Sequence, residues 1–203
     1  MALEKKYTTS ITGSGFMMFE FKQIVGFKIE GLNDKEIKEK VLEENVFQYN
    51  KTSSLKRAIG FLLNRVNALD SNLRQMVKDE PIDVGKVINL YSIMKVDQLF
   101  YEFMQEVVRD CLENDTGILE VKNVNVFFVS KAEQSDFINN LADSTLMKLK
   151  RTYHKVLLET GMLKDLKSRE LKPLLVDEWL KHHLVQIGDI EYLKAMGDVE
   201  GIV

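Results

Sequence analysis

The chain has little cysteine, proline or histidine among its 203 residues, and each shortage excludes a kind of structure or site. A single cysteine, Cys111, excludes an intramolecular disulfide and a cysteine-based zinc site within one chain. Only two prolines, Pro81 and Pro173, leave almost the whole chain able to form long helices. The three histidines form no histidine–acid motif at ligand spacing. We therefore expect no metal, no cofactor and no enzymatic activity.

Long apolar runs are missing as well. The uncharged stretch from Tyr7 to Phe19 is 13 residues long and half polar, and charged residues interrupt the apolar sequence beyond it. A membrane-spanning helix needs about 20 apolar residues, and no amino-terminal segment has the features of a signal peptide. These absences predict a soluble protein of the reducing cytoplasm, with no membrane partner.

Charge is unevenly distributed along a chain whose formal net charge is -3. Between Ser144 and Lys172 there are eight Lys or Arg residues against three acids, whereas between Asp97 and Glu120 a single arginine faces seven acids. The first segment is a candidate surface for a polyanion, and the second would repel one. We expect the acids of the second segment to lie on a solvated face of an aromatic-rich helix.

Apolar residues recur mostly at helical spacing, so the fold class is predicted to be all-α. Expected helices cover residues 16–30, 33–44, 52–69, 82–94, 97–112, 123–131, 135–140, 144–160, 177–184 and 191–195. Asn33 and Glu36 resemble a capping box, while the VNVFFV run from Val124 is compatible with helix or strand. Asn, Asp, Thr and Gly at 114–117 indicate a boundary between two small domains, 1–115 and 118–203.

The stretch from Ser144 to Gly161 is predicted to form a helix with one apolar and one cationic face. Its apolar sector contains Leu146, Leu149, Tyr153, Val156 and Leu157. Its opposite sector contains Ser144, Lys148, Arg151 and Lys155. Gly161 would end the helix, and Met162, Leu163 and the run from Leu171 to Val176 would form a short strand. Helix, basic loop and strand together predict a carboxy-terminal winged helix-turn-helix with a short β-wing.

This segment supplies the first set of candidate DNA-binding residues. They are Ser144, Thr145, Lys148, Arg151 and Lys155 on the helix and Lys164, Lys167 and Arg169 on the following basic loop, which also contains Lys172. The alternative is a solvated helix face without a ligand. His154 lies on the flank of the helix, where it would contact a phosphate or water.

A second helix-turn-helix is a candidate at residues 33–69, with Thr52, Ser53, Lys56 and Arg57 at the start of its second helix. Its link from Asn45 to Lys51 is longer than the three or four residues usual in that motif, so a helical packing unit is the alternative. Four basic residues between positions 51 and 65 are opposed by no acid there: Lys51, Lys56, Arg57 and Arg65. In either case a basic patch is expected.

Thr12–Gly15 offers flexible backbone just before the first expected helix. Backbone amides in such a place can hold a phosphate, but the segment lacks the Gly-Lys-Ser/Thr ending of a P-loop and a preceding strand. A tight turn leading into the helix is the favoured interpretation.

Several longer stretches occur in a distinctive order: YTTSITGSGF (7–16), EENVFQY (43–49), RAIGFLLNRVNAL from Arg57, LYSIMKVDQLFYEFM (90–104) and STLMKLKRTY with its ETGML continuation. In this order they resemble the BrxA family of the BREX bacteriophage-exclusion system. The resemblance implies an all-helical nucleic-acid-binding protein, similar to the antitermination factor NusB. It also implies a non-enzymatic cytoplasmic accessory protein acting beside a DNA methyltransferase, an alkaline-phosphatase-like protein and a large ATPase.

Residues and resemblance together predict a protein that binds double-stranded DNA mainly through phosphates. Sequence preference should be weak, because the cationic arc has no Asn or Gln for a bidentate contact to adenine. One alternative is a protein-interaction scaffold whose acidic, aromatic-rich centre docks a partner. The other is a NusB-like RNA-binding protein, which would need exposed aromatic side chains in the basic stretch, whereas Tyr153 is expected to point inward.

Overall fold

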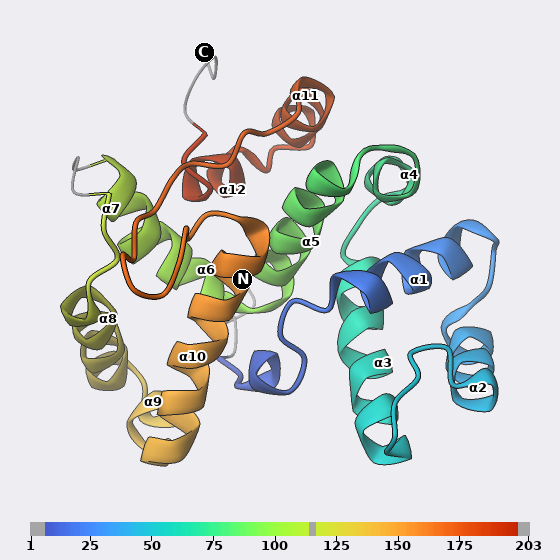
Figure 1. Ribbon diagram of the computed structural model, residues 1–203, viewed down its shortest axis with the longest axis horizontal. Coiled ribbons are helices and arrows are strands. Elements are labelled where there is room, and N and C mark those ends of the chain that lie inside the picture. The colour runs from blue at the N-terminus through green and yellow to red at the C-terminus, as the bar shows by residue number, and fades with distance from the viewer. Residues whose placement is uncertain (1–6, 114–116, 199–203) are drawn as a thin grey trace, which may run out of the picture. The chain divides into compact units, whose positions relative to one another are not determined.

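The computed structural model describes residues 7–113 and 117–198, and these residues are predominantly helical (Figure 1). They form two compact units. Ser10–Val96 make up the amino-terminal unit, and residues 7–9 join residues 97–113 and 117–198 in the carboxy-terminal unit. Within the described ranges, no helix is long and apolar enough to cross a membrane.

The amino-terminal unit is built from amphipathic helices around one apolar core. Its elements are the 3-10 helix η1 (Ser10–Gly13), α1 (Met18–Ile29), α2 (Asp34–Glu44), α3 (Thr52–Asn67), α4 (Ser71–Asp79) and α5 (Ile82–Val96). α1 packs on α3, α4 and α5, while α2 packs on α3. The expected capping box is confirmed: the Asn33 side chain accepts from the backbone N–H of Glu36, whose carboxylate accepts from that of Asn33. These helices bury Phe21, Ile24, Ile59 and Leu62 almost completely.

The carboxy-terminal unit places an aromatic cluster behind its longest helix. Its elements are α6 (Gln98–Phe103), the π-helical segment η2 (Met104–Val108), α7 (Arg109–Glu113), α8 (Val121–Gln134), α9 (Asp136–Asn139), α10 (Asp143–Thr160), α11 (Glu178–Gln186) and α12 (Ile190–Ala195). The Tyr153 ring of α10 lies 5.0 Å from those of Phe100 and Phe103 and 5.8 Å from that of Phe128, centroid to centroid. The VNVFFV run from Val124 is helical and lies in α8, which places Phe128 against this cluster.

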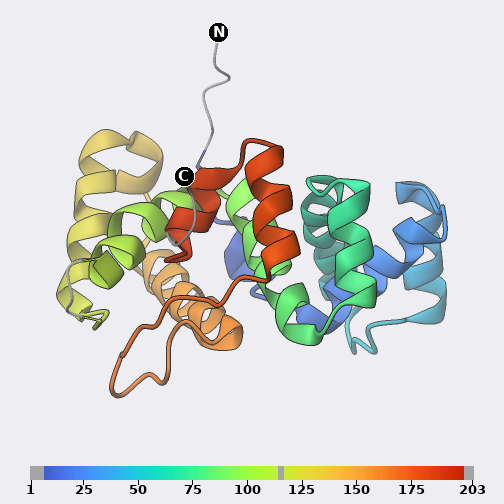
Figure 2. The ribbon, with the colours of Figure 1, turned by 90° about the horizontal axis from the view of Figure 1, so that it is seen from above.

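The predicted β-wing is wrong. In the part of the chain that the structure describes there are only two isolated bridges, Ile118–Glu170 and Leu163–Leu171, and no strand. The pairing stops because Pro173 has no N–H to donate, and the next N–H, of Leu174, bonds to the Met196 carbonyl after α12. The segment between α10 and α11 is instead an irregular loop that extends from the end of α10 (Figure 2). Helices do occupy the three expected places, but without a wing they do not form the predicted winged helix-turn-helix.

The compact units divide between Val96 and Asp97 and not at the expected boundary near 115–118. Residues 114–116 lie outside the described residues, but the chain on both sides of them belongs to one unit. Backbone hydrogen bonds explain why: the Gly117 N–H donates to the Cys111 carbonyl, and the Gly117 carbonyl accepts from Leu171. Asp97 is instead the residue before α6, and its carboxylate accepts a hydrogen bond from the Phe100 N–H in the first turn of that helix.

Candidate nucleic-acid interface

α10 carries the two faces that its sequence predicts. Leu149, Tyr153, Val156 and Leu157 are fully buried, while Lys148, Arg151 and Lys155 are exposed. Leu146 is only half-buried. Gly161 ends the helix in the left-handed region, with φ 84°, as its position predicts.

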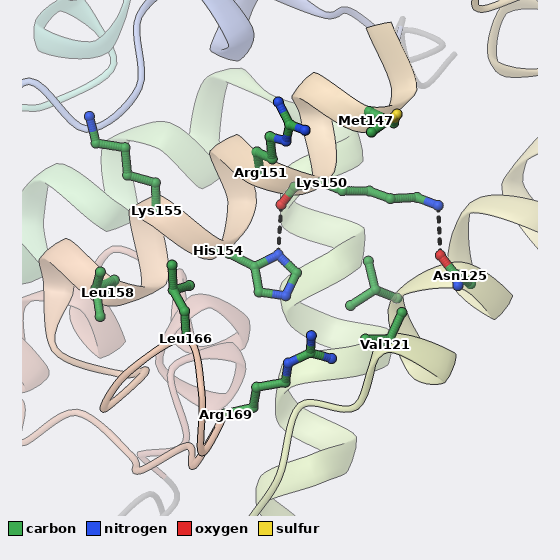
Figure 3. Close-up of a pocket in the computed structure, with 11 residues that line it drawn as sticks. Val121, Asn125, Met147, Lys150, Arg151, His154, Lys155, Leu158, Leu166 and Arg169 are labelled. Atoms are coloured by element: carbon green, nitrogen blue, oxygen red, sulfur yellow. Dashed lines mark hydrogen bonds between the residues drawn. The ribbon is translucent and has the colours of Figure 1, made fainter. Parts of the chain in front are cut away.

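A groove of about 650 Å³ lies between α8, α10 and the loop that follows α10 (Figure 3). Aliphatic side chains from all three elements line it: Val121, Val124, Met147, Leu158 and Leu166. Most of them are also open to solvent; Met147 and Leu166, for example, are 53% and 59% exposed. The groove thus has an apolar lining that remains uncovered by the rest of the described chain.

Four cations share this lining, and no acidic residue does. Lys150, Arg151 and Lys155 come from α10, and Arg169 comes from the loop. Figure 3 shows Arg151 and Lys155 extending outward from α10, whereas the Arg169 side chain projects toward His154. Positive charge at an apolar groove attracts anions more strongly than the same charge in open solvent, because less water screens it.

Lys150 and His154 are positioned by bonds that the sequence does not reveal. The Lys150 ammonium donates to Asn125 Oδ1 of α8 at 2.7 Å and lies 5.5 Å from the centre of the Phe128 ring. His154 Nδ1 lies 2.7 Å from the Lys150 carbonyl oxygen. Because a carbonyl only accepts, Nδ1 carries the proton and Nε2 is left to meet a ligand. Lys150 falls between the two predicted sectors of the helix, which is why periodicity alone leaves it out of the site.

The loop that carries Arg169 is held by a tight turn. The Asp165 carboxylate accepts from the backbone N–H groups of Lys167 and Ser168, both at 2.8 Å, and from the Ser168 hydroxyl at 2.7 Å. The bonds from Ser168, followed by the one from Lys167, lower the pKa of Asp165. Arg169 then adopts the left-handed conformation, with φ 55°. The turn therefore fixes where the Arg169 side chain enters the groove.

The remaining predicted residues of this segment lie outside the groove lining. Lys148 is exposed one turn before Arg151, and Ser144 and Thr145 belong to the first turn of α10. Lys164 forms an ion pair with Glu170 at 2.5 Å, and the exposed Lys167 takes part in the Asp165 turn through its backbone. Lys155 also pairs with Glu159 at 3.6 Å, although its side chain stays 71% exposed. Arg151, Lys155 and Arg169 are the predicted residues that the groove brings together.

The second candidate set lies in the amino-terminal unit. Thr52, Ser53, Lys56 and Arg57 are all exposed on the first turns of α3. Lys56 and Arg57 line a hollow of about 340 Å³ together with Lys38 of α2 and the acid Asp34. The hollow is smaller than the groove and its charge is mixed.

Arg65 does not belong to the expected basic patch, because it is 2% exposed. Its guanidinium donates to the carbonyls of Gly15 and Phe16 at 2.7 and 3.2 Å and to the Ser14 hydroxyl at 2.9 Å. The Asn89 amide, also fully buried, donates to the Phe16 carbonyl at 2.7 Å. The Gly-rich segment thus points carbonyl oxygens toward a buried cation, whereas a phosphate site would need backbone N–H groups. This arrangement fits the favoured interpretation of a turn before α1.

The described residues contain no group of three or more His, Cys, Asp or Glu side chains placed to hold a metal ion. Cys111 is buried.

Fold and site together define a class: a small all-helical protein of two units with a cation-lined groove beside its longest helix. A family model described as BrxA matches residues 5–188. A BREX protein BrxA from Bacillus cereus is 34% identical over 200 residues, covering 98% of this chain and 95% of the relative. The chain therefore belongs to the BrxA family, the BrxA proteins of the BREX phage-exclusion system.

Two further similarities agree with this assignment. A BREX protein BrxA from Paramagnetospirillum magneticum is 25% identical over 173 residues, covering 85% of this chain and 87% of the relative. The crystal structure of an uncharacterised protein from Magnetospirillum magneticum has a TM-score of 0.83 at 23% identity and covers 94% of this chain and 97% of that one. The latter similarity establishes the fold alone.

Proposed function

We propose that this chain binds double-stranded DNA as an accessory protein of a BREX system, mainly through phosphates and without catalysis of its own. The proposed contact surface is the exposed side of α10 with the loop after it. One observation carries the proposal: four cations meet at this surface and no acid lines the groove between them. The cytoplasm, where DNA and a BREX assembly would meet, is the proposed location, and other BREX proteins are the proposed partners.

Phosphate contacts are favoured over base readout by the side chains that α10 exposes. Lys148, Arg151 and Lys155 deliver charge at successive turns, and Ser144 and Thr145 add hydroxyls near the start of the helix. Lysine and arginine without a neighbouring amide provide little discrimination between base pairs beyond guanine contacts. RNA is less favoured because the groove lining contains no Phe, Tyr or Trp on which an unpaired base could stack.

Changing Lys148, Arg151 and Lys155 together to Glu should weaken binding to a 20-base-pair duplex at least about 100-fold, because three attractive contacts become repulsive. Fluorescence anisotropy at several salt concentrations measures this, with a matched RNA duplex alongside. The three phosphates neutralised at α10 should contribute about -3 to the slope of log K against log salt.

A matched control changes Lys35, Lys78 and Lys86 to Glu, which alters the net charge equally but lies in the amino-terminal unit. Its duplex affinity should stay within a few-fold of the unaltered protein. Unchanged binding by the α10 variant, with unchanged circular dichroism, would refute the proposed surface. Absence of binding at low salt would favour the scaffold, and tighter RNA binding would favour the NusB-like alternative.

We further propose a weaker second contact at the start of α3, where Thr52 and Ser53 precede Lys56 and Arg57. Changing Lys56 and Arg57 to Ala should weaken duplex binding by about 3- to 10-fold and make the salt slope shallower by about 1 to 2, because at most two phosphate contacts are lost. The same titration measures both quantities. An unaltered slope would remove this second contact from the proposal and leave the α10 surface untouched.

A further inference from the structure

The groove has a property that duplex DNA does not use. Phosphates engage its cations, but the B-form backbone offers no aliphatic side chain to cover Met147, Leu158 and Leu166. Covering exposed apolar surface is worth roughly 25 cal/mol per Å², so a ligand that meets both the cations and the aliphatic lining binds better than one that meets only the cations. The groove is therefore chemically more specific than a phosphate-binding surface.

We propose that the groove binds an acidic amphipathic α-helix from a protein partner. The charge complementarity is strict: four cations and no acid line the groove, so the partner must supply the carboxylates. The aliphatic lining requires Leu, Ile or Val on the same partner face. Helices that dock into grooves commonly present apolar anchors at positions i, i+3 or i+4, and i+7.

The dimensions fit such a helix. α10 contributes lining residues from Met147 to Leu158, which a rise of 1.5 Å per residue places about 16 Å apart. That length matches about three turns of a partner helix, which carry apolar anchors at i, i+4, i+7 and i+11. Arg151 and Lys155 extend outward along one edge, and Arg169 lies on the loop side with His154 between (Figure 3). Carboxylates flanking the anchors would thus meet cations on both sides.

A single-stranded nucleic acid would carry the right charge but fits the apolar lining less well. Sequence-tolerant binding of single strands relies on stacking of bases on aromatic side chains. His154 is the one aromatic ring in the lining, and its Nδ1 is engaged by the Lys150 carbonyl. Aliphatic side chains from three elements favour an aliphatic partner surface instead.

The test uses the full chain and a fluorescein-labelled, helix-stabilised 16-residue peptide with Leu at i, i+4, i+7 and i+11 and Glu on the flanking positions. A control peptide of identical composition distributes the Leu residues around the helix. Anisotropy titration should give a Kd in the range of about 10 to 100 μM for the first peptide and at least tenfold weaker binding for the second. Equal binding of the two would reduce the interaction to charge attraction and overturn the proposal, as would no binding up to about 1 mM.

Three protein variants separate this proposal from DNA binding. Leu158→Gln with Leu166→Ser removes apolar lining without changing charge, and should weaken the peptide at least about fivefold while leaving duplex affinity within twofold. Leu166→Ser alone changes only the loop and so cannot disturb α10; it should also weaken peptide binding. Arg151→Gln with Lys155→Gln should weaken both ligands.

Leu175→Ser is the matched control, because Leu175 is 98% exposed and lies outside the groove lining. It should leave the peptide affinity unchanged. Peptide binding that is insensitive to the Leu158 and Leu166 changes would place the peptide elsewhere and overturn the proposal. Peptide binding without duplex binding would refute the proposed function and leave this inference standing.

Discussion

Replacing Lys131 with alanine is expected to lower the free energy of unfolding of the carboxy-terminal unit by about 3 kcal/mol, because it leaves the mostly buried Glu102 carboxylate without its cation. The Lys131 ammonium, on α8, lies 2.8 Å from Glu102 Oε2 and 2.6 Å from Glu106 Oε1, and its side chain is 5% exposed. The Tyr7 hydroxyl donates to the same Glu102 oxygen at 2.7 Å, and the Gln98 amide donates to the other at 2.6 Å. This cluster joins α8 to α6 and to the π-helical segment η2.

The pH dependence of this cluster has a definite sign. Burial raises the pKa of Glu102, but hydrogen bonds from Gln98, Lys131 and Tyr7 outweigh burial, and the net pKa is lowered from its ordinary 4.5. A lowered carboxyl pKa contributes stability that is present above the unfolded-state pKa and is lost as the pH falls through the folded-state pKa. The unaltered protein should therefore lose stability below about pH 4.5, and Lys131→Ala should flatten that loss.

Urea unfolding followed by circular dichroism at pH 7 and pH 4 measures both effects. Lys122→Ala is the matched control, since Lys122 lies on α8 but is exposed, and its cost should stay within about 0.5 kcal/mol. A loss under about 1 kcal/mol for Lys131→Ala would mean that water replaces the ammonium at little cost. Lys131→Met with Glu102→Gln should recover part of the stability, because it removes the buried charges from both partners.

Arg65→Ala is expected to cost the amino-terminal unit about 3 kcal/mol. The guanidinium donates to three buried or half-buried acceptors at Ser14, Gly15 and Phe16, and each acceptor left without a donor costs about 1 kcal/mol or more. The segment before α1 should then detach, which exposes the fully buried Phe16. Hydrogen exchange of residues 10–17 should accelerate by more than the global loss of stability explains.

Arg57→Ala provides the comparison on the same helix, since Arg57 is exposed and should cost within about 0.5 kcal/mol. Arg65→Lys should be intermediate, because one ammonium cannot reproduce the fork of the guanidinium. A cost below about 1 kcal/mol for Arg65→Ala would contradict the assigned role and would require another group to satisfy the three acceptors.

Helical periodicity predicts most of this fold because most of the helices bury only one face. The expected segments match α1, α2, α3, α5, α8, α10, α11 and α12 to within a few residues. α4 escapes prediction because its nine residues contain only Leu73 and Val77 as buried anchors. The predicted wing is wrong because apolar residues after a helix form a strand only where another strand pairs with them, and local sequence does not encode that pairing.

The candidate site likewise has one part that local sequence predicts and one part that it does not. The cationic face of α10 follows from its own spacing, but the groove needs Val121 and Asn125 from α8 and Leu166 from a loop, and no local pattern brings these three elements together. Arg65 could have been anticipated: helical spacing sets it next to the buried Ala58, at the edge of the apolar sector of α3. On α3, the basic residue at the rim of the apolar sector is an internal cation and not a ligand contact.

The path of the chain between its two units has a consequence for the order of folding. Ser10–Val96 form one uninterrupted unit, whereas the other unit needs residues 7–9 together with residues after position 96. During synthesis, the uninterrupted unit is complete before the ribosome has released the helices with which Tyr7 makes its contacts. Before this unit folds, its 87 residues form a flexible loop between Tyr7 and Glu102. Once the unit has folded, its two ends lie at a fixed distance, so less entropy is lost when Tyr7 closes onto Glu102. We therefore expect variants that slow folding of the Ser10–Val96 unit also to delay the closure of Tyr7 onto Glu102.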